Sequence, residues 1–336
     1  MMKSRAEVIK QPVTVVMATF VVLLCAAVLR AIVAPYACES TALNSSPLAV
    51  AVDSVLGGTN VFGIICTVLV TILTAAIITR IITRYSVTVV KTLVPSVLFA
   101  LLSFSTLFVV RRPSVALLLL AIVRSSELLI CSFRRDKSYG YVALSGFWLG
   151  TAIMLFPPTM LFVVVTPIIL SIYKRTAREA ITWFLFVLVP IVIASLGWWF
   201  AGFDATYIVA GIIQGTGFSW GGLDTTLLAE LNIATMVSLG AEVLAILAAV
   251  ITFLSEAQDM RLRVRNINIQ FILLLFCATA MLFLGGNPSV VIPIMGLCCV
   301  PTLNLFFVGH GGVAGIVIYI ILIVASLVGT VLQLCL

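Results

Sequence analysis

Residues 109–137 read VVRRPSVALLLLAIVRSSELLICSFRRDK, and this stretch sets the pattern for the whole chain. Basic residues stand at both ends of an apolar run of about 20 residues, the length that a helix needs to cross the hydrocarbon core of a bilayer. The run is continuous and not alternating, so it predicts a transmembrane helix and argues against a strand of a membrane barrel. Arg124 and Glu127 interrupt the run, and their spacing of three places both side chains on one helix face.

The composition extends this interpretation to all 336 residues. Hydrophobic residues make up 62% of the chain and charged residues 9%, and the mean hydropathy is +1.28. Soluble domains contain about 25% charged residues, so the soluble globular class is excluded. We expect one integral membrane domain over residues 1–336, an all-α bundle of about 10–11 transmembrane helices. The predicted spans lie near residues 13–33, 59–79, 91–110, 114–133, 141–156, 159–173, 181–201, 231–254, 267–284, 289–308 and 312–334.

The basic residues predict the orientation of these spans. Fifteen of the nineteen Lys and Arg residues form five clusters, and all five fall on the same side of the predicted span order. Because Lys and Arg stay in the cytoplasm, the N-terminus is predicted to be cytoplasmic, with outside loops at residues 34–58 and 202–230. The clusters are Lys3, Arg5 and Lys10; Arg80, Arg84 and Lys91; Arg134, Arg135 and Lys137; Lys174, Arg175 and Arg178; and Arg261, Arg263 and Arg265.

The same clusters account for the net charge of +7. They lack the interleaved aromatic residues of a surface that binds single-stranded nucleic acid, so no nucleic-acid partner is expected. The lipid bilayer is the partner that the composition predicts. Within the first outside loop, the segment SSPLAVAVDSVL predicts a short helix lying at the membrane interface.

Common catalytic and metal-binding patterns are missing from the sequence. His310, in the segment GHGG, is the single histidine, and metal sites need several converging ligands. The eight cysteines include no CxxC pair, and most fall inside apolar runs, where a thiol behaves as a small hydrophobic group. The sequence has no phosphate-binding loop, dinucleotide fingerprint or nucleophile elbow. We therefore expect neither a resident cofactor nor a metal.

Charges inside the predicted spans are the first candidate functional residues. An ionisable residue at bilayer depth costs roughly 2.5–3.5 kcal/mol on insertion scales and is a functional candidate by default. Arg124 and Glu127 could pair within one helix and lock it against a neighbour, or could serve an ion relay. Glu242 has no basic residue in its own span. It must meet a partner from another span, remain protonated, or face a wet cavity.

A second group of candidates lies at the predicted outer rim of the bundle. Arg30, Arg111 and Arg112 stand there against the positive-inside trend, with Glu39 and Asp53 in the first outside loop. Arginine donates two parallel hydrogen bonds to a phosphate, so this group could hold an anionic lipid headgroup near a carboxylate. The alternative is that the arginines simply extend from helix ends toward the headgroups.

From about Thr59 to Asp204 the chain also resembles an uncharacterised family of polytopic bacterial inner-membrane proteins. The resemblance covers the segments ITRIITRY, KTLVPSVLFALLSF and FRRDKSYGYVALSGFWLGTAIMLFPP, followed by the Arg–Glu pair that enters the next span. It implies a multi-pass protein of the bacterial cytoplasmic membrane and implies no activity. The matching residues are Gly146, Gly150, Pro157, Arg178, Glu179 and Pro301.

A weaker resemblance connects the chain with membrane glycosyltransferases that use polyprenyl-phosphate sugars. Those enzymes have a catalytic acid in the first extracytoplasmic loop, which implies Asp53 or Glu39 here, and a glycine-containing segment similar to GFWLGTAIMLFPP. This chain departs from them because it has neither the paired acidic motif nor a large extracytoplasmic domain. Gly146 and Gly150 also have a structural explanation, as a site of close helix–helix packing.

Three function classes follow from these observations. A lipid-linked sugar enzyme would use Asp53 or Glu39 as general base, with Arg30, Arg111 and Arg112 stabilising the leaving phosphate. A small-solute or ion transporter would use Glu242 and the Arg124–Glu127 pair at a site within the membrane, beside the proline-interrupted segment 141–173. A non-catalytic assembly subunit would need only packing faces for other membrane proteins. The best specific prediction is the handling of a polyprenyl-phosphate sugar at the outer face.

Overall fold

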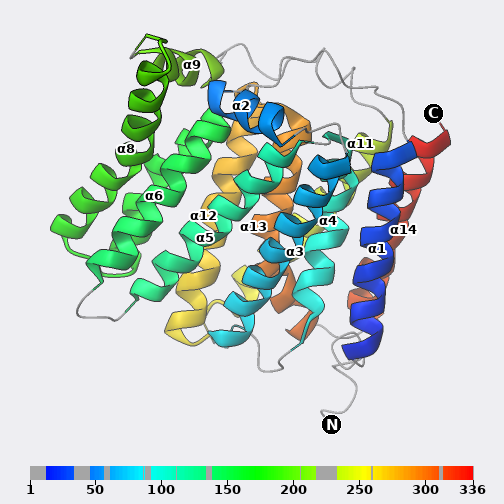
Figure 1. The fold of residues 1–336 in the computed structure, drawn as a ribbon. Helices are drawn as coiled ribbons and strands as arrows, with labels where there is room; N and C mark the ends of the chain where they lie inside the picture. Colours follow the sequence, from blue (N-terminus) through cyan, green and yellow to red (C-terminus); the bar gives the residue numbers. More distant parts are fainter. Residues whose placement is uncertain are drawn as a thin grey trace.

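In a computed structural model, the chain folds into a bundle of α-helices that run side by side (Figure 1). The structure describes residues 13–33, 46–56, 61–85, 87, 92–110, 112–133, 138–204, 206–216, 233–258, 260–309 and 313–335. The elements in these ranges are α1 (Val13–Val33), α2 (Pro47–Val55), α3 (Val61–Arg84), α4 (Val94–Val110), α5 (Pro113–Ser132), α6 (Tyr139–Leu155), the 3₁₀ turn η1 (Pro157–Met160), α7 (Leu161–Ile172), α8 (Ala177–Phe200), α9 (Tyr207–Thr216), α11 (Ile233–Glu256), α12 (Leu262–Phe283), α13 (Pro288–Gly309) and α14 (Val313–Cys335).

The all-α prediction is confirmed, and each of the eleven predicted spans coincides with one helix of the bundle. Five of the described helices are long and apolar enough to cross a membrane by length and composition: α3, α5, α8, α12 and residues 288–307 of α13. The other six predicted spans coincide with further apolar helices of the bundle, and that these cross the membrane remains a prediction. The protein is thus an apolar helical bundle suited to a lipid bilayer.

The two ends of the bundle differ in charge. At one end, called here the basic end, α3 finishes at Arg84, α8 begins next to Arg178 and α12 begins next to Arg263. The short helices α2 and α9 lie across the opposite end (Figure 1). Helix α2 confirms that a short helix forms in the first predicted outside loop, and its place at a membrane interface remains a prediction. Helix α9 occupies part of a segment that the sequence predicted as a loop.

Local sequence signals set the helix ends. Pro47 and Pro113 stand at the first positions of α2 and α5, where a missing N–H costs nothing. Thr176 and Glu179 form a capping box at the start of α8, in which each side chain satisfies a backbone N–H. Lys174 ends α7 in a left-handed conformation (φ 55°), a position where glycine is the usual residue.

Helix α13 forms the centre of the bundle. It is buried along its described side chains and packs against α4, α11 and α12. Helix α8 lies at one edge and α1 with α14 at the other (Figure 1). The outward faces of these edge helices are rich in exposed large hydrophobic side chains, as expected for surfaces that contact lipid tails.

Helices α6 and α8 pack unusually closely because of two glycines. A Cβ atom placed on Gly146 would lie 2.4 Å from the Trp183 carbonyl oxygen, and one on Gly150 would lie 2.2 Å from the Val187 carbonyl oxygen. Both distances are far below van der Waals contact, so only glycine allows this approach. The packing explanation of the two small residues is therefore confirmed.

Segment 141–173 forms a helical hairpin, α6–η1–α7, whose tip lies at the end that carries α2 and α9. The Ser46 hydroxyl, which caps α2, donates a hydrogen bond to the Met154 carbonyl oxygen near this tip. The ring of Pro157 fills the space beside Gly215 of α9. The hairpin therefore runs the length of the bundle and does not turn back halfway.

Candidate functional site

Glu242 is the most unusual ionisable residue in the described part of the chain. It lies nine residues after the start of α11, about 14 Å along the helix axis, and thus well inside the bundle. Its side chain is 2% exposed, and neither carboxylate oxygen has a hydrogen-bond partner among the described residues. The sequence left open a basic partner from another span, a protonated carboxyl group or a wet cavity. The described residues provide no basic partner.

Helices α4 and α13 enclose the Glu242 carboxyl group. Gly296 of α13 is its nearest small neighbour, because a Cβ atom at that position would lie 3.2 Å from Oε1 of Glu242 and 3.2 Å from the Ser103 hydroxyl of α4. The Ser103 hydroxyl donates to the Pro293 carbonyl oxygen at 3.5 Å. The Glu242 carboxyl therefore lies where three helices meet, and a side chain larger than glycine at position 296 would press on it and on Cβ of Leu102.

Proline weakens the backbone of α13 on both sides of this enclosure. Pro293 and Pro301 lie inside the helix, and each lacks the N–H that would bond the carbonyl one turn earlier. Such carbonyl groups at membrane depth seek other donors or water. Helix α13 thus has two interruptions in its backbone hydrogen-bond ladder, and it lies at the centre of the bundle.

Two asparagines carry further unpaired atoms toward the basic end. Asn304 of α13 is fully buried, and neither atom of its amide has a partner among the described residues. Asn268 of α12 is also buried, and its side-chain oxygen is unpaired although its amide nitrogen donates to the Val264 carbonyl. Both lie within two turns of the basic end. Polar atoms without partners therefore occur at two depths of the core.

Glu127 of α5 is held by two arginines and not by one. Arg124 of the same helix donates to its Oε2, which confirms the predicted contact. Arg80 of α3 approaches its Oε1 to 3.5 Å, which the sequence did not predict. The Glu127 side chain is 2% exposed, whereas those of Arg80 and Arg124 are 55% and 35% exposed. One buried carboxylate therefore joins α3 to α5 near the basic end.

Aromatic and basic groups surround this ion pair at the basic end. The guanidinium group of Arg263 lies 4.5 Å from the centre of the Tyr85 ring, a cation–π distance. The Tyr85 hydroxyl and the Cys131 sulfur are 2.7 Å apart. Burial, reinforced by the hydrogen bond with Cys131, raises the pKa of Tyr85 to about 12, so its hydroxyl keeps its proton at physiological pH. The basic end of the bundle therefore places the positive charge of Arg263 next to the neutral phenol of Tyr85.

Asp53 of α2 faces the start of α5. Its carboxylate accepts hydrogen bonds from the Ser114 backbone N–H at 3.0 Å and from the Ser114 hydroxyl at 2.9 Å. The Arg112 guanidinium lies 4.0 Å away. Burial raises the pKa of Asp53, while these two hydrogen bonds and the Arg112 charge oppose the rise. Asp53 therefore caps the start of α5. Both of its carboxylate oxygens, which a general base would use, are engaged in these hydrogen bonds.

The structure assembles only part of the predicted outer rim. Asp53 and Arg112 meet, as described above. Arg30 lies in α1, which packs mainly on α3, α4 and α14, whereas α2 packs on α5, α6 and α9. The side chain of Arg30 lies outside the described residues, and so do Glu39 and Arg111 entirely.

Sequence reasoning missed partners that are distant in the chain. Arg80 was assigned to a cytoplasmic cluster, and nothing in its local sequence ties it to Glu127. Ser114 follows the proline that starts α5, a position where a side chain from another segment can cap a helix. Among the described residues no group of three or more His, Cys, Asp or Glu side chains could hold a metal ion.

No protein-family model, curated protein or solved structure matches this chain. Neither the resemblance to the bacterial inner-membrane family nor that to polyprenyl-phosphate glycosyltransferases is tested by these comparisons.

Proposed function

We propose that this protein is a membrane carrier in which Glu242 takes up and releases a proton during transport. The observation that carries the proposal is a carboxyl group inside the bundle, 2% exposed, with no described partner for either oxygen. Burying an ionised carboxylate without a partner costs far more than burying a neutral carboxyl group. In the conformation described here Glu242 therefore holds a proton.

Release of that proton requires a second conformation in which water or a substrate reaches the carboxyl. The surrounding helices suit such a change. Pro293 and Pro301 interrupt the hydrogen-bond ladder of α13, and interrupted helices commonly line transport sites. Gly296 lets α13 approach α4 and the Glu242 carboxyl closely, since a Cβ atom there would lie 2.9 Å from Cβ of Leu102 and 3.2 Å from Oε1 of Glu242.

Dicyclohexylcarbodiimide, which reacts with protonated carboxyl groups in apolar surroundings, tests the state of Glu242 directly. We expect the reagent to modify Glu242 in membranes, with no modification in the Glu242→Gln variant. Glu127 is the internal control, because it is equally buried but already paired with two arginines. Mass spectrometry of peptides would locate the adduct. Modification of Glu127 in preference to Glu242 would contradict the proposed protonation.

Proteoliposomes loaded with a pH-sensitive dye test transport itself. Gradients of sugars, amino acids and inorganic anions would be imposed one class at a time, and proton movement recorded. We expect one class to drive proton movement in the wild type and not in Glu242→Gln. If no class drives proton movement, or if the variant equals the wild type, the carrier proposal fails.

A second candidate is the handling of a polyprenyl-phosphate sugar at the end that carries α2. It is favoured by the approach of Arg112 to Asp53, since a phosphate could replace the carboxylate beside this guanidinium. Native mass spectrometry of gently extracted protein tests it. We expect a polyprenyl phosphate to copurify and to be lost in Arg112→Ala, and its absence from the wild-type protein would overturn this candidate.

A further inference from the structure

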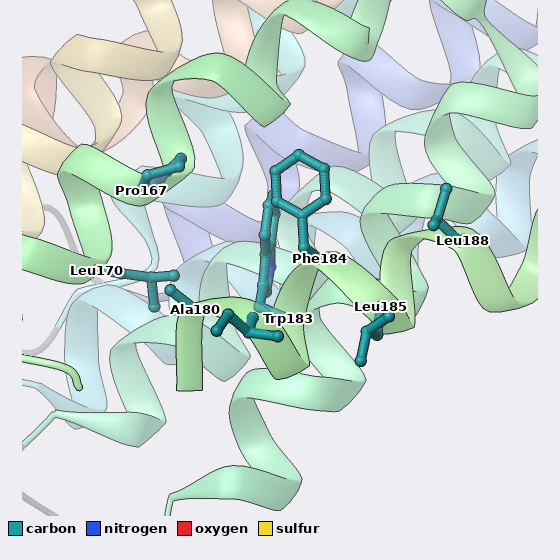
Figure 2. Close-up of a pocket in the computed structure, with 8 residues that line it drawn as sticks. Pro167, Leu170, Ala180, Trp183, Phe184, Leu185 and Leu188 are labelled. Atoms are coloured by element: carbon teal, nitrogen blue, oxygen red, sulfur yellow. The ribbon is translucent and has the colours of Figure 1, made fainter. Parts of the chain in front are cut away.

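An apolar groove separates α7 from α8 on the outer surface of the bundle. Its cavity measures about 260 Å³, and every group in its wall is apolar. Figure 2 shows the rings of Trp183 and Phe184 near its middle, with Pro167 and Leu170 of α7 on one side. Three of its α8 side chains, Ile181, Phe184 and Leu185, are about half exposed or more. The groove is therefore open to the lipid phase.

The groove forms because α7 and α8 pack against different neighbouring helices. Gly146 and Gly150 bring α8 against α6, whereas α7 packs on α12. Pro167 lies inside α7 and removes one backbone hydrogen bond, which favours a bend in that helix. The two helices share a tight connection and then diverge, so a wedge-shaped space remains between them.

Two basic residues stand where this wedge closes at the basic end. Lys174 lies in the connection between the helices, and Arg178 lies in the first turn of α8 on the same face as Ile181 and Leu185. Both side chains are exposed, and neither forms an ion pair with a described residue. Arg175, between them, points instead to the Ser138 hydroxyl at 2.6 Å and to Glu179 at 3.6 Å.

We propose that this groove binds one anionic phospholipid, with an acyl chain between α7 and α8 and the phosphate on Lys174 and Arg178. An acyl chain matches the apolar wall, because each buried methylene group contributes to binding as it would on insertion into a bilayer. The two free cations supply the selectivity for a negative headgroup that an apolar groove alone lacks. The proposal is independent of proton transport by Glu242.

Trp183 makes the groove observable. Its side chain is fully buried in the wall, and its indole nitrogen has no hydrogen-bond partner among the described residues. Bromine atoms on an acyl chain quench tryptophan fluorescence on close approach. Brominated phosphatidylglycerol and brominated phosphatidylcholine, each added to the protein in phosphatidylcholine vesicles, therefore compare an anionic with a zwitterionic occupant.

We expect brominated phosphatidylglycerol to quench the wild-type protein at lower lipid fractions than brominated phosphatidylcholine does. Because the chain has five tryptophans, the share of Trp183 is the wild-type quenching minus that of Trp183→Phe, and this share should carry the difference between the two lipids. Each of Lys174→Gln and Arg178→Gln should weaken phosphatidylglycerol binding about fivefold, and the double variant about 25-fold. Arg84→Gln is the matched control, because Arg84 is exposed at the same end but belongs to α3, which packs mainly on α4 and α5. It should leave the difference unchanged.

Native mass spectrometry gives a second readout that does not depend on Trp183. We expect one retained phosphatidylglycerol in the wild type and in Arg84→Gln, and none in the Lys174→Gln/Arg178→Gln variant. Equal quenching by the two brominated lipids would mean that the groove contacts only ordinary bulk lipid and would overturn the proposal. Equal loss in Arg84→Gln would overturn it as well, since the effect would then come from general surface charge.

Discussion

Replacing Gly150 by alanine is the sharpest test of how α6 and α8 are held together. The added methyl carbon would lie 2.2 Å from the Val187 carbonyl oxygen and 2.6 Å from Cγ of the Pro190 ring. Neither obstacle is flexible, because one is backbone and the other a closed ring. To restore ordinary contact at 3.4 Å, the carbonyl would have to retreat by about 1.2 Å, and a gap of that size forfeits much of the dispersion energy along the contact.

The magnitude follows from two opposing effects. Overpacking a close contact costs about 1–3 kcal/mol, and we expect the upper end here because the obstacles cannot rotate away. Alanine gains up to about 1 kcal/mol over glycine in a helix. The expected net loss in the free energy of unfolding is therefore about 2 kcal/mol, measured by reversible denaturation in mixed micelles.

Gly197 of α8 provides the matched control for this prediction. A Cβ atom there meets nothing within 4 Å, so Gly197→Ala keeps the helix-propensity gain without the clash. We expect this variant to be as stable as the wild type or up to about 1 kcal/mol more stable. If Gly150→Ala matched Gly197→Ala in stability, the close packing of α6 on α8 would be refuted.

Three further predictions test the charges. The double variant Arg80→Ala/Arg124→Ala should lose about 3–5 kcal/mol of unfolding free energy, because it leaves Glu127 buried and unpaired. Each single variant should lose less than half of that. Additive single effects in a double-mutant cycle would contradict the shared pairing. Lys174→Gly should raise the free energy of unfolding by about 1 kcal/mol, because glycine adopts the left-handed conformation without strain, and Lys174→Ala should give no such gain. Because the pKa of Asp53 is raised, the folded protein binds this proton more tightly than the unfolded chain does. The wild type should therefore lose stability relative to Asp53→Asn as pH rises from 3.8 through the folded-state pKa. A pH-independent difference in the free energy of unfolding would contradict this sign.

Most of the architecture was predictable because it depends on local properties of the chain. Apolar runs of membrane length dictate helices, since backbone groups in lipid must be bonded within their own segment. Helix starts also depend on local chemistry, since Ser46 caps α2 and Pro113 begins α5 through effects that act within one turn. Helix α9 was missed because it is only 10 residues long and lies between loop-like segments.

The class of protein, the positions of the long helices, and the residues that are costly inside the bundle (Glu242, Glu127 and Arg124) could all be predicted from the chain alone. The surroundings of these residues could not. The packing of the helices places Arg80 beside Glu127 and Ser114 beside Asp53. It leaves Glu242 without a partner among the described residues. The cost of burying a charged side chain depends on the type of residue, so it can be predicted from a single segment. Its pairing depends on which helices pack together. In this bundle that choice depends on shape, as at Gly146 and Gly150, and shape complementarity joins segments that no local pattern connects.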